Sequence, residues 1–546
     1  MQRIVLAFVL LPCCLVWAAP VEVRFSQSAA SVAAYDFLEV SLEVGGPFSG
    51  NPFTEAKFDG SFGPAGGSGR VHVDGFCDSA DGTQFRIRFM PSKPGAYAYT
   101  VKYAAHGVEQ THEGTFQATV AGHRGPVRVD PAYPWHFIWE GTQDHYFFHG
   151  TTAFWLMGWR DERVIRSSLE RLRRLKINRV RVLLGGRSSM MYGEPAMNTA
   201  EWSMFLSPWP AEKADDFFHP GFDYTCFRPE HWQRFERMLA FAQEKNIVIS
   251  VIFDIADGKI HPPAGSEEER RYFRYAAARL AAFSNITWDL GDDLDSFRDD
   301  RWAHETGTLL QGWDPYRHLA TSHPVHREHQ DRASDWFGFT SIQDWSRDQH
   351  ALMLAERQLQ IKSGRIIPQA NEEYGYEDHY PLWAPAPPAD SAETLRRTAW
   401  DIAMAGAYGT AGETARRGVG IWPDTGGGWM NGRSDDTTTM LAGYAHMVDF
   451  LTSFDWWKTE PHDELVDARN WCLAEPGQTY AVYLPNARKV TIRLLAGRYL
   501  AHWFDPLTGE TIPIGMAEGP EWTSPPAPGR NDWALLLRKS NAGLQP

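Results

Sequence analysis

Two short acidic stretches of the chain carry side chains that could do chemistry. Residues 285–293 read Asn-Ile-Thr-Trp-Asp-Leu-Gly-Asp-Asp and end in the adjacent carboxylates Asp292 and Asp293. Residues 366–377 read Ile-Ile-Pro-Gln-Ala-Asn-Glu-Glu-Tyr-Gly-Tyr-Glu. A pair of carboxyl groups on either side of a sugar is the machinery of glycosidases, because one protonates the leaving oxygen while the other attacks or stabilises an oxocarbenium-like carbon. The alternative for any single acid is that it caps a helix N-terminus, as Asp often does.

Apolar runs that alternate with amphipathic helical stretches indicate the elements that position these acids. Buried strands alternating with helices are typical of a parallel sheet. The runs lie at 146–148, 180–184, 247–253, 286–290, 318–322, 336–341, 366–370 and 406–412. Eight such repeats predict a closed (β/α)8 TIM barrel, in which catalytic residues follow the carboxyl ends of the strands. The two acidic stretches end the fourth and seventh strands of that barrel, so we expect them to face one another across its mouth.

The regions on either side of the barrel have a different pattern. Short alternating segments broken by Gly and Pro predict a β-sandwich before the barrel and a second one after it. The predicted fold is therefore multidomain, with a TIM barrel flanked by two β-sandwiches. The expected boundaries are 1–19 for a signal peptide, 20–122 for the N-terminal sandwich, 123–458 for the barrel and 459–546 for the C-terminal sandwich. We expect the sandwiches to be chiefly structural, with Trp456, Trp457 and Trp503 anchoring the C-terminal one to the barrel.

The first residues predict export. Arg3, an apolar run over 4–17 and the small residues Ala18 and Ala19 are typical of a secretory signal peptide. The apolar run is shorter than a bilayer span requires, so we expect a protein without a membrane span, secreted to the periplasm or the medium. Three widely spaced cysteines follow the leader, at 77, 226 and 472, and they indicate neither a disulfide framework nor a metal site. The histidines show no HExxH spacing, so we expect no catalytic metal and no cofactor.

Composition narrows the class of partner. The chain has 53 Lys and Arg against 68 Asp and Glu, for a net charge of −15, so a nucleic-acid partner is disfavoured. It also has 23 Trp, and broad flat rings suit stacking against sugars. The alternative is that large β-rich cores simply use Trp. We expect an oligo- or polysaccharide substrate.

The two acidic stretches also resemble a known family. Trp288-x-Leu290-Gly291-Asp292-Asp293 and the segment 371–377 are similar to the fourth- and seventh-strand motifs of apiosidase-like glycoside hydrolases, a clan of retaining (β/α)8 enzymes. Segments 51–53, 75–78 and 86–89 resemble the N-terminal β-sandwich domain of unknown function that often precedes these barrels. Segments 428–433 and 456–462 look like the eighth-strand loop and the linker. Segments 480–485 and 503–509 resemble a collagen-binding-type terminal β-domain.

The resemblance implies roles for individual acids. Asp293 aligns with the acid/base of the family and Glu373 with its nucleophile. Many barrel glycosidases have Asn-Glu where this chain has Asp-Asp, so the reach of the acid differs by one methylene. Glu372 is the rival nucleophile, because alternation of side chains at a strand end lets only one of the two glutamates point into the mouth. We choose Glu373 because Glu-Tyr-Gly matches the seventh-strand pattern better.

Other polar and aromatic residues near the predicted strand ends could bind sugar hydroxyls or orient the carboxylates. Each has an alternative role that only stabilises the fold, such as an Arg-Asp ion pair, a hydrogen-bonded loop histidine or a core tryptophan. The substrate-binding candidates are Arg181, Asp254, Asp292, His323, His326, Gln343, Trp345, Glu377, Trp422, Trp429 and Arg433.

These observations predict a secreted retaining glycoside hydrolase that cleaves a plant, algal or bacterial glycan by a two-carboxylate double displacement. The alternative is a non-catalytic carbohydrate-binding or surface-adhesion protein with the same Trp-rich mouth. A binder has no need of carboxylates at both the fourth and the seventh strand ends. A barrel lyase or isomerase would need a Lys or a metal cluster at the rim, and the sequence shows neither.

Overall fold

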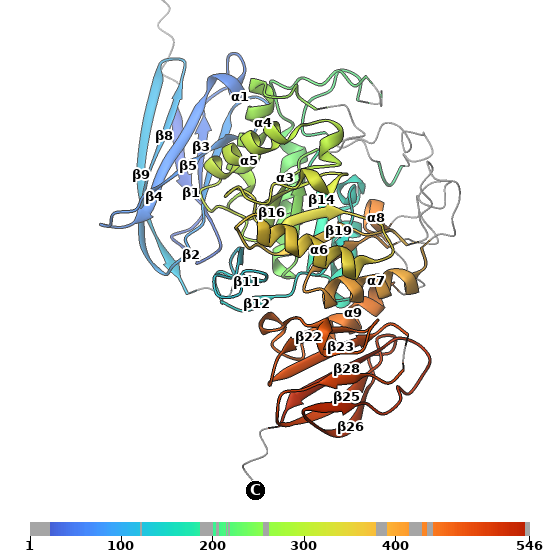
Figure 1. The fold of residues 1–546 in the computed structure, drawn as a ribbon. Coiled ribbons are helices and arrows are strands. Elements are labelled where there is room, and N and C mark those ends of the chain that lie inside the picture. Colours follow the sequence, from blue (N-terminus) through green and yellow to red (C-terminus); the bar gives the residue numbers. More distant parts are fainter. Residues whose placement is uncertain are drawn as a thin grey trace, which may run out of the picture.

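The computed structural model has three regions in sequence order, with β-rich N- and C-terminal regions on two sides of a central barrel (Figure 1). The residues that the structure describes are 22–120, 123–185, 200–203, 207–214, 216, 219–254, 261–377, 390–413, 428–433, 440–486 and 488–540, apart from the side chain of Trp429. The predicted leader and Trp422 lie outside these residues. No helix of the described ranges is long and apolar enough to cross a membrane.

The N-terminal region is built from two sheets that share one core. Their strand orders are β1-β3-β7-β6 and β2-β9-β8-β4-β5. Alternation makes the core: Leu38, Val40 and Leu42 of β3 are fully buried, while the residues between them are partly exposed. A short helix, α1 (Pro52–Glu55), precedes β4. The strands are β1 (Val23–Gln27), β2 (Ser31–Ala33), β3 (Leu38–Val44), β4 (Lys57–Pro64), β5 (Val71–Asp74), β6 (Phe76–Cys77), β7 (Gln84–Phe89), β8 (Gly95–Ala105) and β9 (Val108–Thr119).

The central region contains the predicted eight-stranded parallel barrel. Its strand order is β17-β16-β15-β14-β13-β20-β19-β18, and a parallel bridge between Ala320 and Phe337 joins the two ends of the sheet. The strands are β13 (Gly150–Thr152), β14 (Arg179–Leu183), β15 (Val248–Ile252), β16 (Ile286–Asp292), β17 (Ala320–His323), β18 (Thr340–Gln343), β19 (Gln369–Glu373) and β20 (Tyr408–Ala411). The TIM-barrel prediction is confirmed.

One strand assignment was wrong. The aromatic run 146–148 was expected to be the first barrel strand, but that strand is β13, which begins at Gly150. Tyr146 instead ends β12 (His145–Tyr146), in a small antiparallel sheet with β10 (Val127–Val129) and β11 (Phe137–Trp139). The rings of Phe137 and Phe148 stack there, with centroids 5.9 Å apart. An apolar run marks burial, and here packing against neighbouring rings provides it without a place in the barrel sheet.

Helices cover the outside of the barrel, and capping side chains mark where several begin. Asp161, Ser266, Asp299, Asp348 and Ser391 each accept a hydrogen bond from a backbone N–H of the first turn. The helices are α2 (Glu162–Arg174), α3 (Pro229–Glu244), α4 (Glu267–Leu280), α5 (Asp300–Trp313), α6 (Gln349–Lys362), α7 (Ala392–Met404), α8 (Gly428–Asn431) and α9 (Met440–Leu451).

The strands that carry the acidic stretches both have an irregular register at their carboxyl ends. Between β16 and β17, Asp289 pairs with Thr321 and Asp292 with His323, so three residues on one strand match two on the other. Between β18 and β19, the partner of Ile342 is Asn371 while that of Gln343 is Glu373. An extra residue of this kind is a β-bulge, which breaks the alternation of side chains and re-aims those that follow.

A buried ionic network joins the N-terminal region to the barrel. Arg88 of β7 donates to Glu39 of β3 at 2.8 Å and to Glu236 of α3 at 3.0 Å. Arg279 of α4 donates to the same Glu236 at 2.6 Å and pairs with Asp78 at 2.7 Å. Breaking one partner of such a pair leaves a buried charge without compensation, so the network holds the two regions in one arrangement.

The C-terminal region is a six-stranded sheet, β21-β22-β23-β28-β25-β26, with a two-stranded sheet, β24-β27. Trp456 and Trp457 pack on the barrel as expected, since Trp457 stacks on His145 at 3.8 Å between ring centroids. Trp503 was wrongly assigned to the interface: it lies in the core of the C-terminal region, while the next residue, Phe504, faces Trp400 of α7. The strands are β21 (Glu460–Pro461), β22 (Trp471–Glu475), β23 (Thr479–Leu484), β24 (Thr491–Arg493), β25 (Arg498–Phe504), β26 (Thr511–Glu518), β27 (Glu521–Thr523) and β28 (Trp533–Lys539).

Candidate active site

Arg181 of β14 is the cationic centre of the barrel mouth. Its side chain is fully buried, and its guanidinium lies 2.6 Å from Asp292, 3.4 Å from Asp289 and 3.8 Å from Glu373. The ring of Phe154 lies 5.5 Å from the guanidinium carbon. One cation thus compensates three carboxylates that end the fourth and seventh strands. Burying acids away from water is costly unless they are paired in this way.

Glu373, the last residue of β19, is held from several directions. Gln343 of β18 donates to its Oε1 at 2.8 Å. Burial raises the pKa of Glu373, while Arg181 and hydrogen bonds from Tyr376, Gln343 and Trp345 act against that rise. A carboxylate fixed by donors on several elements cannot rotate freely. Such a group is held in one orientation before any ligand binds.

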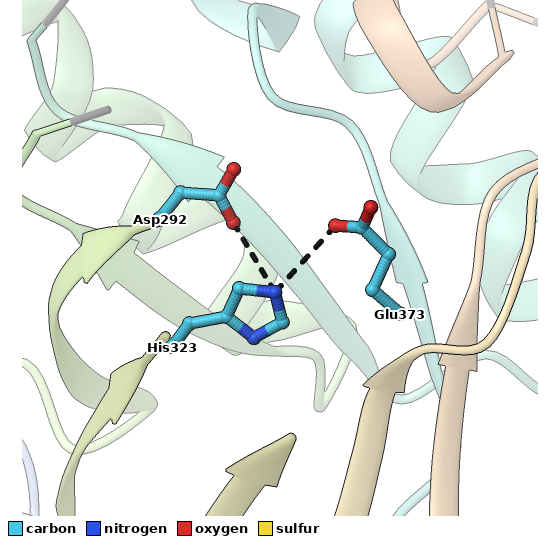
Figure 2. A group of neighbouring side chains, drawn as sticks. All are labelled: Asp292, His323 and Glu373. Atoms are coloured by element: carbon cyan, nitrogen blue, oxygen red, sulfur yellow. Dashed lines mark ion pairs between the residues drawn. The ribbon is translucent and has the colours of Figure 1, made fainter. Parts of the chain in front are cut away.

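Asp292, the last residue of β16, approaches Glu373 from the opposite side of the mouth (Figure 2). The Nε2 atom of His323 faces the gap between them, 3.6 Å from Asp292 and 3.5 Å from Glu373. Burial and the charge of Arg181 lower the pKa of His323 to about 4, so the ring is neutral near pH 7. Its Nδ1 lies 3.0 Å from the hydroxyl oxygen of Ser341, which also hydrogen-bonds Glu372.

Glu372 is also inside the barrel, one layer below Glu373. Arg179 of β14 donates to Glu372 at 2.9 Å, and also to Thr287 at 2.6 Å and Ser250 at 2.8 Å. The alternation rule wrongly predicted that only one of the two glutamates points inward, because the irregular register at the end of β19 lets both do so. Burial alone would raise the pKa of Glu372, but the charge of Arg179 outweighs it and the pKa is lowered. Glu372 therefore serves as the counter-ion of a buried arginine.

Asp293 follows β16 with a left-handed backbone, at φ 54° and ψ 38°. It immediately precedes the 3-10 helix η4 (Leu294–Ser296), but its side chain makes no capping hydrogen bond there. The helix-cap interpretation is therefore wrong for this residue. Asp tolerates the left-handed region at a cost, and such conformations cluster at functional sites. Asp293 is also more exposed than Asp292, which is 3% exposed.

The remaining predicted residues are distributed unevenly around the mouth. Trp345 packs edge-on against Tyr376, with ring centroids 5.3 Å apart. Asp254 follows β15 and is buried, which raises its pKa well above the usual range, and its carbonyl accepts from the amide of Asp292 at 2.9 Å. Glu377 is buried beyond the Glu373 turn, with its amide bonded to Gly412.

The other predicted residues lie away from the carboxylates or cannot be located. His326 is exposed and pairs with Asp295 at 2.6 Å. In the described part of the chain no contact joins it to the acidic group, by which we mean Asp289, Asp292 and Glu373 around Arg181. Arg433 is exposed, with its guanidinium 5.4 Å from the ring of Trp159. Trp422 and the side chain of Trp429 lie outside the described residues.

Several residues of the site were not predicted from the sequence. Arg179 could have been found, because it lies two positions before Arg181 on one strand and so faces the same way. Tyr376 lies within the 371–377 motif, and the positive φ of Gly375, 146°, lets the chain turn back so that Tyr376 reaches Glu373. Asp289 and Ser341 have no sequence signal of their own, because their roles come from pairing across strands.

Asp292, His323 and Glu373 also have the donor types of a metal site. One ligand atom from each lies within 4.8 Å of the others. Arg181, however, already positions a guanidinium at 2.6 Å from Asp292 and 3.8 Å from Glu373. A second cation between the same carboxylates would be repelled by the first. The arrangement suits acid and nucleophile chemistry on an uncharged substrate better than metal binding.

The comparisons with known proteins agree with this geometry. Residues 172–414, which contain the whole acidic group, match the family model described as "Apiosidase-like, catalytic domain". Over these residues the barrel is similar to an apiosidase-like catalytic domain. In the flanking regions, residues 31–104 match "Domain of unknown function (DUF5060)" and residues 462–538 match "Putative collagen-binding domain of a collagenase". The resemblance predicted from the sequence motifs is confirmed.

Solved structures share the architecture around the apiosidase-like domain. A putative glycoside hydrolase from Bacteroides vulgatus ATCC 8482 superposes with a TM-score of 0.78 at 20% identity, over 94% of this chain and 100% of that chain. A glycoside hydrolase family 5 protein from the same organism gives 0.61 at 16% identity, over 77% and 95%. At these identities the likeness establishes the fold. No curated protein gives a significant match. Together, the family match and the fold support a glycoside hydrolase.

Proposed function

We propose that the protein is a secreted retaining glycoside hydrolase in which Glu373 is the nucleophile and Asp293 is the acid/base. One observation carries the proposal: a carboxylate at the end of the seventh strand is held by several donors and faces Asp292, the last residue of the fourth strand and the neighbour of Asp293. That arrangement is the two-carboxylate requirement of glycoside hydrolysis. A protein that only binds sugar has no use for three mutually repelling buried acids, whose compensation requires Arg181.

The first step forms a covalent glycosyl-enzyme. An oxygen of Glu373 attacks the anomeric carbon while Asp293 donates its proton to the glycosidic oxygen, so the bond to the leaving alcohol breaks with charge balanced. Arg181 and the donors around Glu373 keep the attacking carboxylate ionised and oriented. The Nε2 atom of His323 lies 3.5 Å from Glu373, where it can hydrogen-bond a hydroxyl of the sugar.

The choice of Asp293 over Asp292 rests on where each acid lies. The imidazole of His323 faces the gap between Asp292 and Glu373, at 3.6 and 3.5 Å, so Asp292 is engaged by two side chains. Burial raises the pKa of Asp292, while its pair with Arg181 at 2.6 Å acts against that rise and holds the carboxyl in place. Asp293 is more exposed and is turned by its left-handed backbone, as expected of an acid that must meet both a leaving group and a water.

The second step releases the sugar. Once Glu373 is esterified its negative charge is gone, so the pKa of Asp293 falls. Asp293 then stays ionised after it has given up its proton, and the ionised carboxylate can act as base toward the incoming water. The water attacks the anomeric carbon, the bond to Glu373 breaks, and the product keeps the configuration of the substrate. Asp292 acts as a positioning residue in this scheme, because it orients Arg181 without touching the reacting atoms.

We further propose a plant, algal or bacterial glycan as the substrate and export as the route to it. The leader-like segment 1–19 supports export. Aromatic residues around the mouth, such as Trp345, support a sugar ligand.

The test compares Asp293→Asn with Asp292→Asn and Glu373→Gln on a panel of aryl glycosides and polysaccharides. Glu373→Gln should abolish turnover of every substrate. Asp293→Asn should slow substrates with poor leaving groups most, and azide should partly rescue cleavage of activated aryl glycosides, whereas Asp292→Asn should lower activity on all substrates without azide rescue. Proton NMR of the first-formed product should show the retained anomer. An inverted product, or azide rescue in Asp292→Asn alone, would overturn the assignment.

A further inference from the structure

A second cleft lies outside the barrel mouth, between the N-terminal sheets and the barrel. Its volume is about 600 Å³, within the range of small-ligand sites. One wall comes from α1 and from strands β4 and β5, and the other comes from α4 and the last residue of α5. Figure 1 shows α1, α4 and α5 on the side of the barrel that faces the N-terminal sheets. Residues of the acidic group do not line it.

The charge of this cleft is opposite to that of the whole chain. Four cationic side chains line it, Lys57, Arg270, Arg271 and Arg274, against the two carboxylates Asp74 and Glu267. The chain as a whole has a net charge of −15. A positive cleft on an acidic protein attracts anions locally, since the field is focused between low-dielectric walls.

Three of these cations are ion-paired or hydrogen-bonded, and within the described ranges the fourth, Arg271, has only a longer-range interaction with the carboxylate of Asp223. Arg274 makes a two-point pair with Asp74, both contacts at 2.7 Å, and Lys57 pairs with Asp59 at 2.7 Å. Arg270 donates to the carbonyl of Gly265. Arg271 makes neither an ion pair nor a side-chain hydrogen bond to any residue that the structure describes, and its Nη1 is shielded from solvent. A shielded donor without an acceptor costs free energy unless a ligand supplies the acceptor.

Aromatic side chains line the same cleft as Arg271. Phe53 of α1 and Trp313 at the end of α5 are only partly buried. The rings of Phe58 and Tyr275 are buried in its wall. Flat apolar rings and a guanidinium in one cleft suit a ligand that has both an apolar ring face and a carboxylate.

We propose that this cleft is an accessory binding site for acidic oligosaccharide, in which Arg271 pairs with the carboxylate of a uronic acid residue and Trp313 contacts the face of a sugar ring. A guanidinium binds a carboxylate through two parallel hydrogen bonds, which gives selectivity over neutral sugars. The site goes beyond the proposed hydrolysis, because it retains a polymer chain on the protein and takes no part in bond cleavage. Its ligand shares the anionic sugar chemistry of sulfated glycans, so the test includes both.

The experiment uses the full chain with Glu373→Gln, so that no probe is consumed. Isothermal titration calorimetry measures the binding of a purified oligogalacturonate, a neutral maltohexaose, a sulfated carrageenan hexasaccharide and an acidic poly-glutamate peptide. We expect the oligogalacturonate to bind best and more weakly as salt rises. Arg271→Gln should weaken its binding by about tenfold to hundredfold, since it removes a charge-assisted contact. Arg271→Lys should recover part of that loss.

Controls separate this site from the barrel mouth and from a folding defect. Arg301→Gln changes an arginine of α5 that is 83% exposed and outside the cleft, and it should leave binding unchanged. The thermal midpoint of each variant checks folding. Hydrogen exchange should show protection of 267–278 by the oligogalacturonate. Trp313→Ala should weaken binding with unchanged exchange at the mouth.

Three results would overturn the proposal: no binding of any uronate, unchanged binding in Arg271→Gln, or binding of poly-glutamate as tight as that of the oligogalacturonate. Preference for the sulfated probe would also overturn it, in favour of a sulfated glycan. Failure of the proposed hydrolysis would leave these measurements unaffected, because neither Glu373 nor Asp293 lines the cleft.

Discussion

Replacing Arg181 by Gln tests whether one cation sets the ionisation of the nucleophile. Arg181 lies 3.8 Å from Glu373, 2.6 Å from Asp292 and 3.4 Å from Asp289, and no water-exposed surface of its side chain remains. Burial raises the pKa of Glu373, and Arg181 is the first influence that opposes the rise. Without it the pKa of Glu373 increases further, so the carboxylate is ionised only at higher pH.

The expected size follows from the distance. Two unit charges 3.8 Å apart interact by about 4 kcal/mol at an effective dielectric constant of about 20. Since each 1.36 kcal/mol is about tenfold in rate, even a third of that energy predicts a loss of about tenfold in kcat/KM on the acid side of the profile. The loss should shrink as the pH rises and Glu373 becomes ionised again.

Stability should change with the opposite dependence on pH. Burial already holds the folded-state pKa values of the three carboxyls above their usual values, and removing the counter-ion raises them further. A protonated carboxyl needs no counter-ion, so the destabilisation by Arg181→Gln should be small below about pH 4, where the carboxyls of the unfolded chain are also protonated. It grows as the pH rises, toward the about 3–5 kcal/mol that is typical of breaking a buried ion pair.

The assay is the pH profile of kcat/KM with an activated aryl glycoside, together with thermal midpoints over the same pH range. Arg181→Lys keeps the positive charge, so the acidic limb of its profile should lie close to that of the unaltered protein. Arg433→Gln is the matched control, because this mouth arginine contacts the ring of Trp159 and makes no ion pair with the acidic group in the described ranges. An acidic limb at the same pH in Arg181→Gln and in the unaltered protein would refute the reasoning.

Other contacts support four more predictions. Glu372→Gln should lower the thermal midpoint, since it leaves Arg179 without its carboxylate, while the acidic limb of the profile stays at the same pH. Glu236→Gln should cost about 3–5 kcal/mol in unfolding measurements at pH 7, and because the pKa of Glu236 is about 2, that difference should vanish as the pH falls from 4.5 to 2. Truncation after Lys458 should produce a less soluble protein, because it exposes the face of α7 that packs on the C-terminal sheet; a soluble, equally stable fragment would contradict this. Mass spectrometry of protein secreted by its host should find a chain that begins near Pro20, and an intact Met1 would exclude export by cleavage.

Local pattern was enough to predict the architecture and the two stretches where chemistry would occur. Period-2 alternation and apolar runs between helices depend only on neighbouring residues, so the barrel and both flanking sheets could be read from them. The same information failed where burial had a different cause. The run 146–148 is as apolar as a strand, yet its rings pack in the small sheet before the barrel. Trp503 and Phe504 are equally apolar, and only strand direction decides which one meets the barrel.

The residues of the acidic group illustrate the same division at the site. The order of the residues along the chain predicts that carboxylates end the fourth and seventh strands. Which of them face one another is decided by register: the extra residues in β16 and β19 break the alternation, so that Asp289 and Asp292 both reach Arg181 and both glutamates enter the barrel. Register depends on hydrogen bonds between strands that are far apart in sequence, and no short-range pattern contains it. The sequence by itself therefore determined which residue types are available to this protein, and the tertiary structure decided which acids are paired with an arginine and which face one another.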